Sequence, residues 1–142
     1  MVERDYVLRI LQEFFESIGK VMRRTSDIED PDTSHLQERF YEMYRQFFRT
    51  DADHFYETDK EIILEDLENE GRSEEDNYAK AQMLSELLYR DALIKKSVQE
   101  RCDLLDKSLH LLEYLNANTR TFSWERNQRI ADIKKMLNEY EI

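Results

Sequence analysis

Residues that interrupt helices are scarce in this sequence. The 142 residues include only two glycines, Gly19 and Gly71, and one proline, Pro31. Because sheets and tight turns usually recruit glycine and proline, this scarcity predicts an all-α fold. Apolar residues make up 40% of the chain, which excludes a disordered chain and is enough to build a hydrophobic core. We expect one domain over residues 1–142, with a possible seam at residues 70–73.

Cysteine is also nearly absent, since Cys102 is the only one. A single cysteine excludes an intrachain disulfide and a four-cysteine zinc site. A reducing, cytoplasmic location fits this usage. Cys102 lies near the start of a predicted helix, where a thiol pKa can fall. No histidine is near it in sequence, and buried free cysteines are common, so we interpret it as structural.

Long apolar runs and sequence motifs of the common enzyme classes are missing too. No apolar run approaches the roughly 18 residues that a membrane span requires, and the segment "MVERDYVLRI" is too charged for a signal peptide. We expect no membrane association. The sequence contains no glycine-rich phosphate loop, nucleophile elbow, zinc spacing or dinucleotide fingerprint, and we predict no cofactor.

The charge is strongly negative and unevenly distributed. The net charge is −11, which argues against nucleic acid as a partner because phosphates are bound by lysine and arginine. Residues 57–76 carry ten acids against two bases, whereas residues 120–135 carry five bases against two acids. These segments could pair within one molecule or between two copies, or they could be solvated helix faces.

Apolar residues recur at helical spacing along the whole chain, which predicts a bundle of five to six helices. The helix at about 74–96 is apolar on nearly every side and should lie at the centre. Within it, Glu86 and Arg90 are four residues apart and could pair. Ser108 is a small residue at the centre of an apolar face, where another helix can approach. The other expected helices span about 3–23, Ser34 to Arg49, 59–69, 98–116 and Ser123 to Tyr140.

One stretch, "DHFYETDKEIILEDLENEG", resembles a chemical site, but a helix start explains more of its residues. Asp51, His54 and Glu57 are three residues apart, and a helix would place them on one face as half of a carboxylate-bridged metal site. Thr58 and Glu61 instead have the spacing of a capping box. On that second interpretation, Gly71 ends the helix and Ser73 caps the next one.

A tryptophan with arginines around it marks the beginning of the last predicted helix. Trp124 lies off the apolar stripe of that helix, with Arg120, Arg126 and Arg129 nearby in the segment "TRTFSWERNQR". The tryptophan could anchor a partner, as aromatic and arginine side chains often do in interfaces. It could also cover the preceding loop.

Two segments resemble a family of small, uncharacterised bacterial helical proteins. The segment "RDYVLRILQEFFESIGKVM" is similar to the family's start, through Asp5, Tyr6 and Arg9. The segment "LSELLYRDALIKKSVQERCDLLDKSLHLLEYL" resembles its tetratricopeptide-like hairpin, and "TFSWERNQRIADIKKML" would be the C-terminal capping helix. Tyr89 and Arg101 stand where the tetratricopeptide pattern has glycine and alanine. The resemblance implies no activity, cofactor or catalytic residue.

The function that these observations favour is non-catalytic protein–protein interaction or self-association. The candidate surface is formed by the helices predicted at 98–116 and from Ser123 to Tyr140, with Trp124, and the acidic segment 57–76 is a second candidate. The alternative is a metal-dependent or small-molecule enzyme that uses the cluster around His54. A third hypothesis is a regulator of a nucleic-acid-binding protein, whose acidic helices imitate phosphate.

Overall fold

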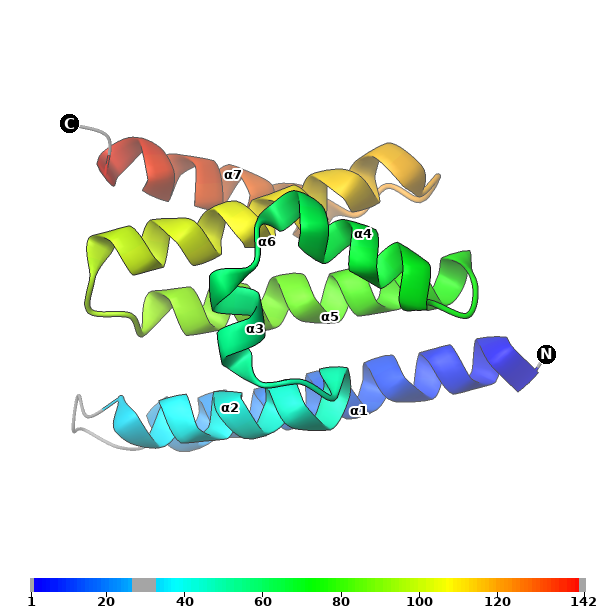
Figure 1. Ribbon diagram of the computed structural model, residues 1–142, viewed down its shortest axis with the longest axis horizontal. Helices are drawn as coiled ribbons and strands as arrows, with labels where there is room; N and C mark the ends of the chain where they lie inside the picture. Colours follow the sequence, from blue (N-terminus) through cyan, green and yellow to red (C-terminus); the bar gives the residue numbers. More distant parts are fainter. Residues whose placement is uncertain (1, 27–32, 141–142) are drawn as a thin grey trace. The chain divides into compact units, whose positions relative to one another are not determined.

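The computed structural model of the chain describes residues 2–26 and 33–140, and all of the regular structure in these ranges is α-helical (Figure 1). This confirms the all-α prediction. The described residues form seven helices, so the predicted count of five to six is wrong. They are α1 (Val2–Ser26), α2 (Ser34–Phe48), α3 (Ala52–Glu57), α4 (Lys60–Glu70), α5 (Glu74–Leu93), α6 (Val98–Asn118) and α7 (Trp124–Tyr140). None of these helices combines the length and the apolar character that crossing a bilayer requires.

The contacts divide the chain into two compact units. Unit 1 is Met1–Glu57 and unit 2 is Thr58–Ile142. Residues 70–73, where the sequence suggested a seam, lie inside unit 2 between α4 and α5. Organisation as one domain stays a prediction.

Unit 1 is held together by aromatic side chains. The rings of Phe14 on α1 and Phe47 on α2 meet edge to face with centroids 5.2 Å apart. Phe55 of α3 is buried, and its ring centroid lies 5.6 Å from that of Tyr44 and 5.8 Å from that of Phe48. Such aromatic pairs add to the stabilisation that area burial alone provides. Helix α3, which the sequence did not predict, therefore packs on α2 through Phe55.

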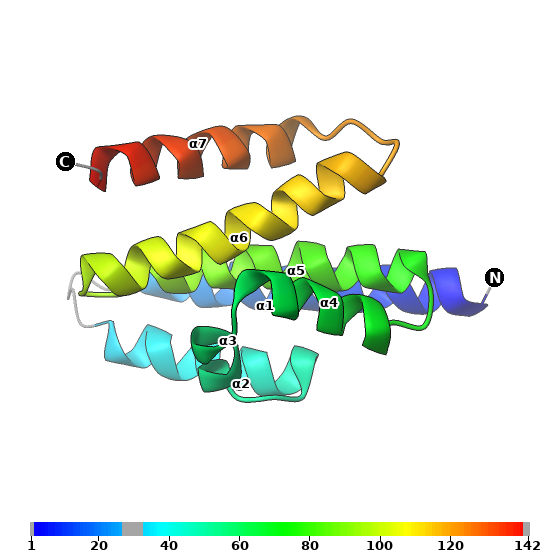
Figure 2. The ribbon, with the colours of Figure 1, turned by 45° about the horizontal axis from the view of Figure 1, so that its top comes forward.

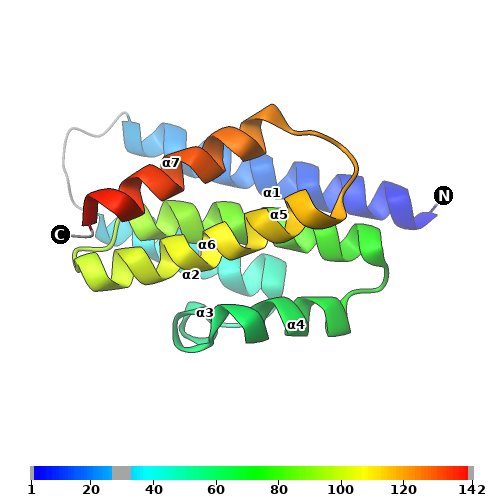
Figure 3. The same ribbon diagram turned by 90° about the horizontal axis from the view of Figure 1, so that it is seen from above.

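Unit 2 is built around the hairpin of α5 and α6. As predicted, α5 is buried on nearly every side, and α6 runs antiparallel beside it (Figure 2). Ser108 and Ser85 are both buried where the two helices pack, and the Ser108 hydroxyl donates to the Ser85 carbonyl at 2.7 Å. Helix α7 returns along α6 with Ile130 and Ile133 buried (Figure 3). Helix α4 packs against both α5 and α6.

The ends of α4 differ in part from the prediction. Its N-cap is Asp59, which makes no side-chain capping hydrogen bond, so the predicted capping box at Thr58 does not start this helix. Gly71 is the C-cap as predicted, but its backbone is extended (φ −69°, ψ 144°) and not left-handed. Ser73 caps α5 as predicted, because its side chain accepts a hydrogen bond from the Asp76 N–H at 3.1 Å.

Candidate functional site

The predicted metal ligands do not form a site. Asp51, His54 and Glu57 are all exposed. Asp51 forms an ion pair with Arg45 at 3.6 Å, and the imidazole of His54 lies against the ring of Phe55, with centroids 5.2 Å apart. Within residues 2–26 and 33–140, no group of three or more histidine, cysteine, aspartate or glutamate side chains is arranged to hold a metal ion.

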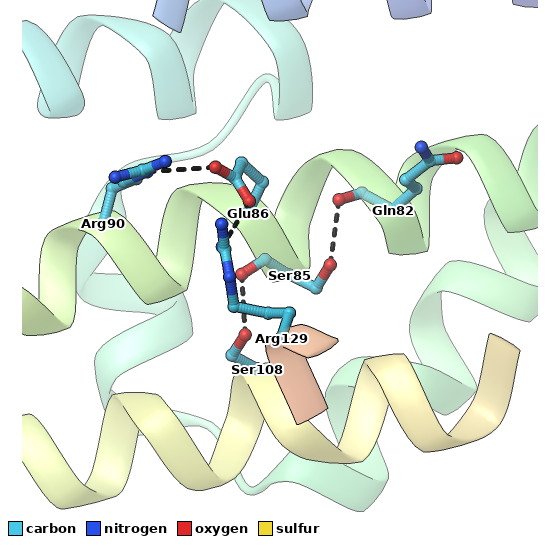
Figure 4. Close-up of polar contacts among 6 residues, drawn as sticks. All are labelled: Gln82, Ser85, Glu86, Arg90, Ser108 and Arg129. Atoms are coloured by element: carbon cyan, nitrogen blue, oxygen red, sulfur yellow. Dashed lines mark hydrogen bonds and ion pairs between the residues drawn. The ribbon is translucent and has the colours of Figure 1, made fainter. Parts of the chain in front are cut away.

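Arg129 points into unit 2, away from solvent. Its Nη1 lies 2.5 Å from Glu86 Oε2 on α5, and its guanidinium carbon lies 3.8 Å from the centroid of the Tyr89 ring. Glu86 Oε1 accepts a second charge-assisted hydrogen bond from Arg90 Nε at 3.0 Å, which confirms the predicted pair (Figure 4). One carboxylate thus joins two guanidiniums, and Arg129 fastens α7 to α5.

Arg126 also forms hydrogen bonds within unit 2. Its Nε donates to Asn116 Oδ1 at 2.6 Å, and its Nη2 donates to Thr119 Oγ1 at 3.1 Å and to the Thr121 carbonyl at 2.9 Å. Burial lowers the pKa of Arg126 from its ordinary value, because desolvation penalises the charged form. Of the three predicted surface arginines, only Arg120 is exposed.

The bonds of Arg126 fix the connection between α6 and α7, which we call the aromatic turn (residues 119–124). Thr119 caps α6, with its N–H and its hydroxyl both donating to the Leu115 carbonyl. Ser123 accepts from the Arg126 N–H at 3.1 Å, as an N-cap does. Asn116 and Asn127 join the two helix ends by a side-chain hydrogen bond of 2.8 Å. The backbone of this turn is therefore held at both ends and in the middle.

Two large aromatic side chains project from the aromatic turn into solvent. Phe122 is 76% exposed and Trp124 is 66% exposed. The interpretation that Trp124 covers the preceding loop is therefore wrong. Sequence reasoning missed Phe122, although it stands between two predicted helices and outside the apolar stripe of either, a position with no neighbour to bury it.

The connection between α4 and α5 lies at the same end of unit 2 as the aromatic turn (Figures 1 and 2). We call residues 68–75 the acidic turn. The Tyr78 hydroxyl donates to the Asn118 carbonyl at 3.4 Å, which ties the start of α5 to the end of α6. Burial, together with the charges of Glu68 and Glu74, raises the pKa of Tyr114 in the last turns of α6. The carboxylates of the acidic turn thus act electrostatically on the end of α6 that leads into the aromatic turn.

The arrangement presents an aromatic surface rather than a set of reactive groups. Cys102 is half-buried on α6, and among the described residues its thiol belongs to no group of three or more candidate metal ligands. Comparisons with protein families, with curated proteins and with solved structures find no match for this chain. The fold and this surface define an all-α protein with a helical hairpin, a third helix along it and an exposed aromatic turn.

Proposed function

We propose that this protein is a non-catalytic interaction module and that the aromatic turn is its binding surface. The observation that carries the proposal is the contrast within this turn. Its backbone is fixed by Thr119, Ser123 and Arg126, while Phe122 and Trp124 remain exposed.

Exposed aromatic side chains on a rigid turn suit binding for two energetic reasons. Complete burial of one large apolar side chain is worth about 1.5–3 kcal/mol relative to leaving it exposed. Because the turn is already ordered, a partner does not have to offset the entropy of ordering it. Tryptophan is also among the residues most enriched in the energetic centres of interfaces.

We further propose that α5 and α6 are a tetratricopeptide-like hairpin capped by α7. The two residues that depart from that repeat pattern support the role of α7. Tyr89 lies beneath the guanidinium of Arg129, and Arg101 Nη1 donates to the Tyr140 hydroxyl at 2.8 Å. Both of these residues therefore contact α7. A single capped repeat does not form the concave groove that arrays of repeats use for binding. We therefore propose the aromatic turn, and not the hairpin, as the binding surface.

Site-specific photo-crosslinking tests this function. A photoreactive phenylalanine analogue replaces Phe122 in one variant and Val98 in a matched control. Val98 is 52% exposed and begins α6, at the opposite end of that helix from the aromatic turn. We expect a discrete crosslinked species from position 122 in a lysate of the native source, and none from position 98.

The double variant Phe122→Ala/Trp124→Ala completes the test. It should lose the interaction but keep its helical circular dichroism, because both side chains are exposed. Light scattering of the purified protein distinguishes self-association from a different partner. A monodisperse monomer that crosslinks to nothing through position 122 contradicts the proposal.

A further inference from the structure

The surroundings of the aromatic turn are acidic, although the sequence around it is basic. Around the acidic turn, the four carboxylate side chains of Glu68, Glu70, Glu74 and Glu75 are exposed, against one exposed base, Arg72. Of the five bases in residues 120–135, Arg126 and Arg129 bond to groups of unit 2, and Arg120, Lys134 and Lys135 are exposed. Glu113 and Glu125, near the aromatic turn in sequence, are exposed as well, and Arg120 is the exposed base of that turn. A partner that approaches this end of unit 2 therefore meets more exposed carboxylates than exposed bases, together with two exposed aromatic rings.

We propose that the aromatic turn binds a cationic segment of another protein, one that carries lysine or arginine beside apolar residues. The inference rests on the proposed function and names the chemistry of the partner. Phe122 and Trp124 offer faces for apolar side chains and for cation–π contacts with lysine or arginine. The carboxylates of the acidic turn complement the positive charge and steer the encounter. A second copy is a poor occupant because each copy carries a net charge of −11, and like charges repel.

Two peptides of matched hydrophobicity test the charge of the partner. One is an amphipathic peptide of lysine and leucine, and the other has glutamate in place of each lysine. Trp124 is the only tryptophan in the chain, so its fluorescence reports on this site without a label. We expect the lysine peptide to change the Trp124 emission and the glutamate peptide to leave it unchanged. Raising the salt concentration should weaken binding, because added ions screen exposed charges.

Variants then test whether binding occurs at this surface, with the affinity of a labelled lysine peptide measured by fluorescence anisotropy. We expect Phe122→Ala/Trp124→Ala to weaken binding by about tenfold or more, as the loss of two anchors implies. Glu74→Gln/Glu75→Gln should weaken binding roughly three- to tenfold, since each exposed charge pair makes only a small contribution to affinity. A control within unit 2, Glu100→Gln/Glu139→Gln, makes the same change in net charge at exposed positions at the start of α6 and near the end of α7, away from the aromatic turn, and should leave the affinity within about twofold.

The outcomes separate this inference from the proposed function. If the two peptides bind equally and both lose affinity in Phe122→Ala/Trp124→Ala, the aromatic turn is a binding surface but the cationic partner is wrong. If the lysine peptide does not bind, or binds equally to the variant without the two aromatic side chains, the inference fails. A dimer that forms through the aromatic turn in light scattering would make a second copy the occupant, and it would also overturn the inference.

Discussion

Arg129 Nη1 and Glu86 Oε2 lie 2.5 Å apart and join α7 to α5, two helices that both pack against α6. The two side chains are only 23% and 17% exposed, and the Tyr89 ring covers the guanidinium from one side. In this position water screens the pair less than it screens a surface pair. The carboxylate also accepts from Arg90, so both of its oxygens have partners.

Removing one side chain of this network should destabilise unit 2 more than removing an ordinary surface polar side chain would. We expect Glu86→Ala to lower the free energy of unfolding by about 2–4 kcal/mol, because it leaves the partly buried Arg129 guanidinium without its carboxylate. Arg129→Ala should cost about 1–3 kcal/mol, because Glu86 keeps Arg90 as a partner. Urea denaturation measures this loss. The double variant should cost less than the sum of the single variants, with a coupling energy of roughly 1–2 kcal/mol.

Arg120→Ala is the matched control, since Arg120 is an exposed arginine of the same region. It should change the free energy of unfolding by no more than about 0.5 kcal/mol. Equal effects of Arg120→Ala and Arg129→Ala would show that the Glu86–Arg129 pair does not hold α7.

Ser108 should accept only a small side chain, because it is fully buried where α5 and α6 pack and its hydroxyl donates to the Ser85 carbonyl. Ser108→Ala removes one hydrogen bond and should cost about 1 kcal/mol. Ser108→Leu adds volume to a packed contact and should cost about 1–3 kcal/mol or more, with partial separation of the helices. The control Ala117→Leu changes an exposed position of the same helix. If thermal unfolding shows Ala117→Leu to be less stable than Ser108→Leu, the contact between α5 and α6 does not require a small residue at position 108.

Gly71 is needed for space and not for its backbone conformation. Its φ of −69° and ψ of 144° suit any residue, but a Cβ built there would lie 1.3 Å from the Asn77 Oδ1. In Gly71→Ala the Asn77 side chain must turn aside, which offsets the roughly 0.4–1 kcal/mol by which alanine in a compatible conformation usually stabilises, so we expect the free energy of unfolding to stay unchanged or to fall by up to about 1 kcal/mol.

The double variant Gly71→Ala/Asn77→Ala identifies the cause. The Asn77 Oδ1 is buried without a hydrogen-bond partner, so shortening this side chain removes the collision and forfeits no bond of that atom. We expect chemical denaturation to give the double variant a higher stability than Gly71→Ala. If the double variant is no more stable, the collision with Asn77 is not the reason for glycine.

Features that depend on helical periodicity could be predicted from the sequence. Features that depend on contacts between side chains far apart in the sequence could not. The central position of α5, the small contact at Ser108 and the Glu86–Arg90 pair all follow from helical spacing, and the structure confirms them. Arg126 and Arg129 were predicted to be surface residues because their acceptors, Asn116 and Glu86, lie on other helices. Helix α3 was missed because its formation depends on Phe55 packing against α2, which no short window of sequence reveals.

Tyr114 should make the stability of the protein fall faster above pH 10. Burial of the phenol raises its pKa in the folded state above the usual value near 10. The unfolded chain then loses this proton at a lower pH than the folded protein does, so the free energy of unfolding decreases as the pH rises from about 10 through the folded pKa. Tyr114→Phe keeps the ring but removes the titration, and it should decline less in denaturant titrations over this range.

The difference between Tyr114→Phe and the unchanged protein isolates the contribution of this one group. Lys60 acts in the same direction, since its hydrogen bond with Asp106 raises its pKa, but it is present in both proteins and cancels. If the two proteins lose stability in parallel above pH 10, the phenol of Tyr114 is not held in its neutral form by the fold.

Arg126 should control the rigidity of the aromatic turn separately from the presence of the aromatic side chains. Its guanidinium contacts Asn116, Thr119 and Thr121, and these contacts fix the backbone that carries Phe122. In Arg126→Gln, the shorter amide side chain cannot reach all three acceptors, so amide hydrogen exchange in residues 119–124 should accelerate by about tenfold, which corresponds to roughly 1.4 kcal/mol less protection. Binding through the turn should then weaken because a partner must order it first.

Arg120→Gln is the control. It removes an equal charge from the exposed side chain of the same turn and should leave the exchange unchanged. If Arg126→Gln accelerates exchange but binds as tightly as the unchanged protein, rigidity is not what makes the two aromatic side chains of this turn a binding surface.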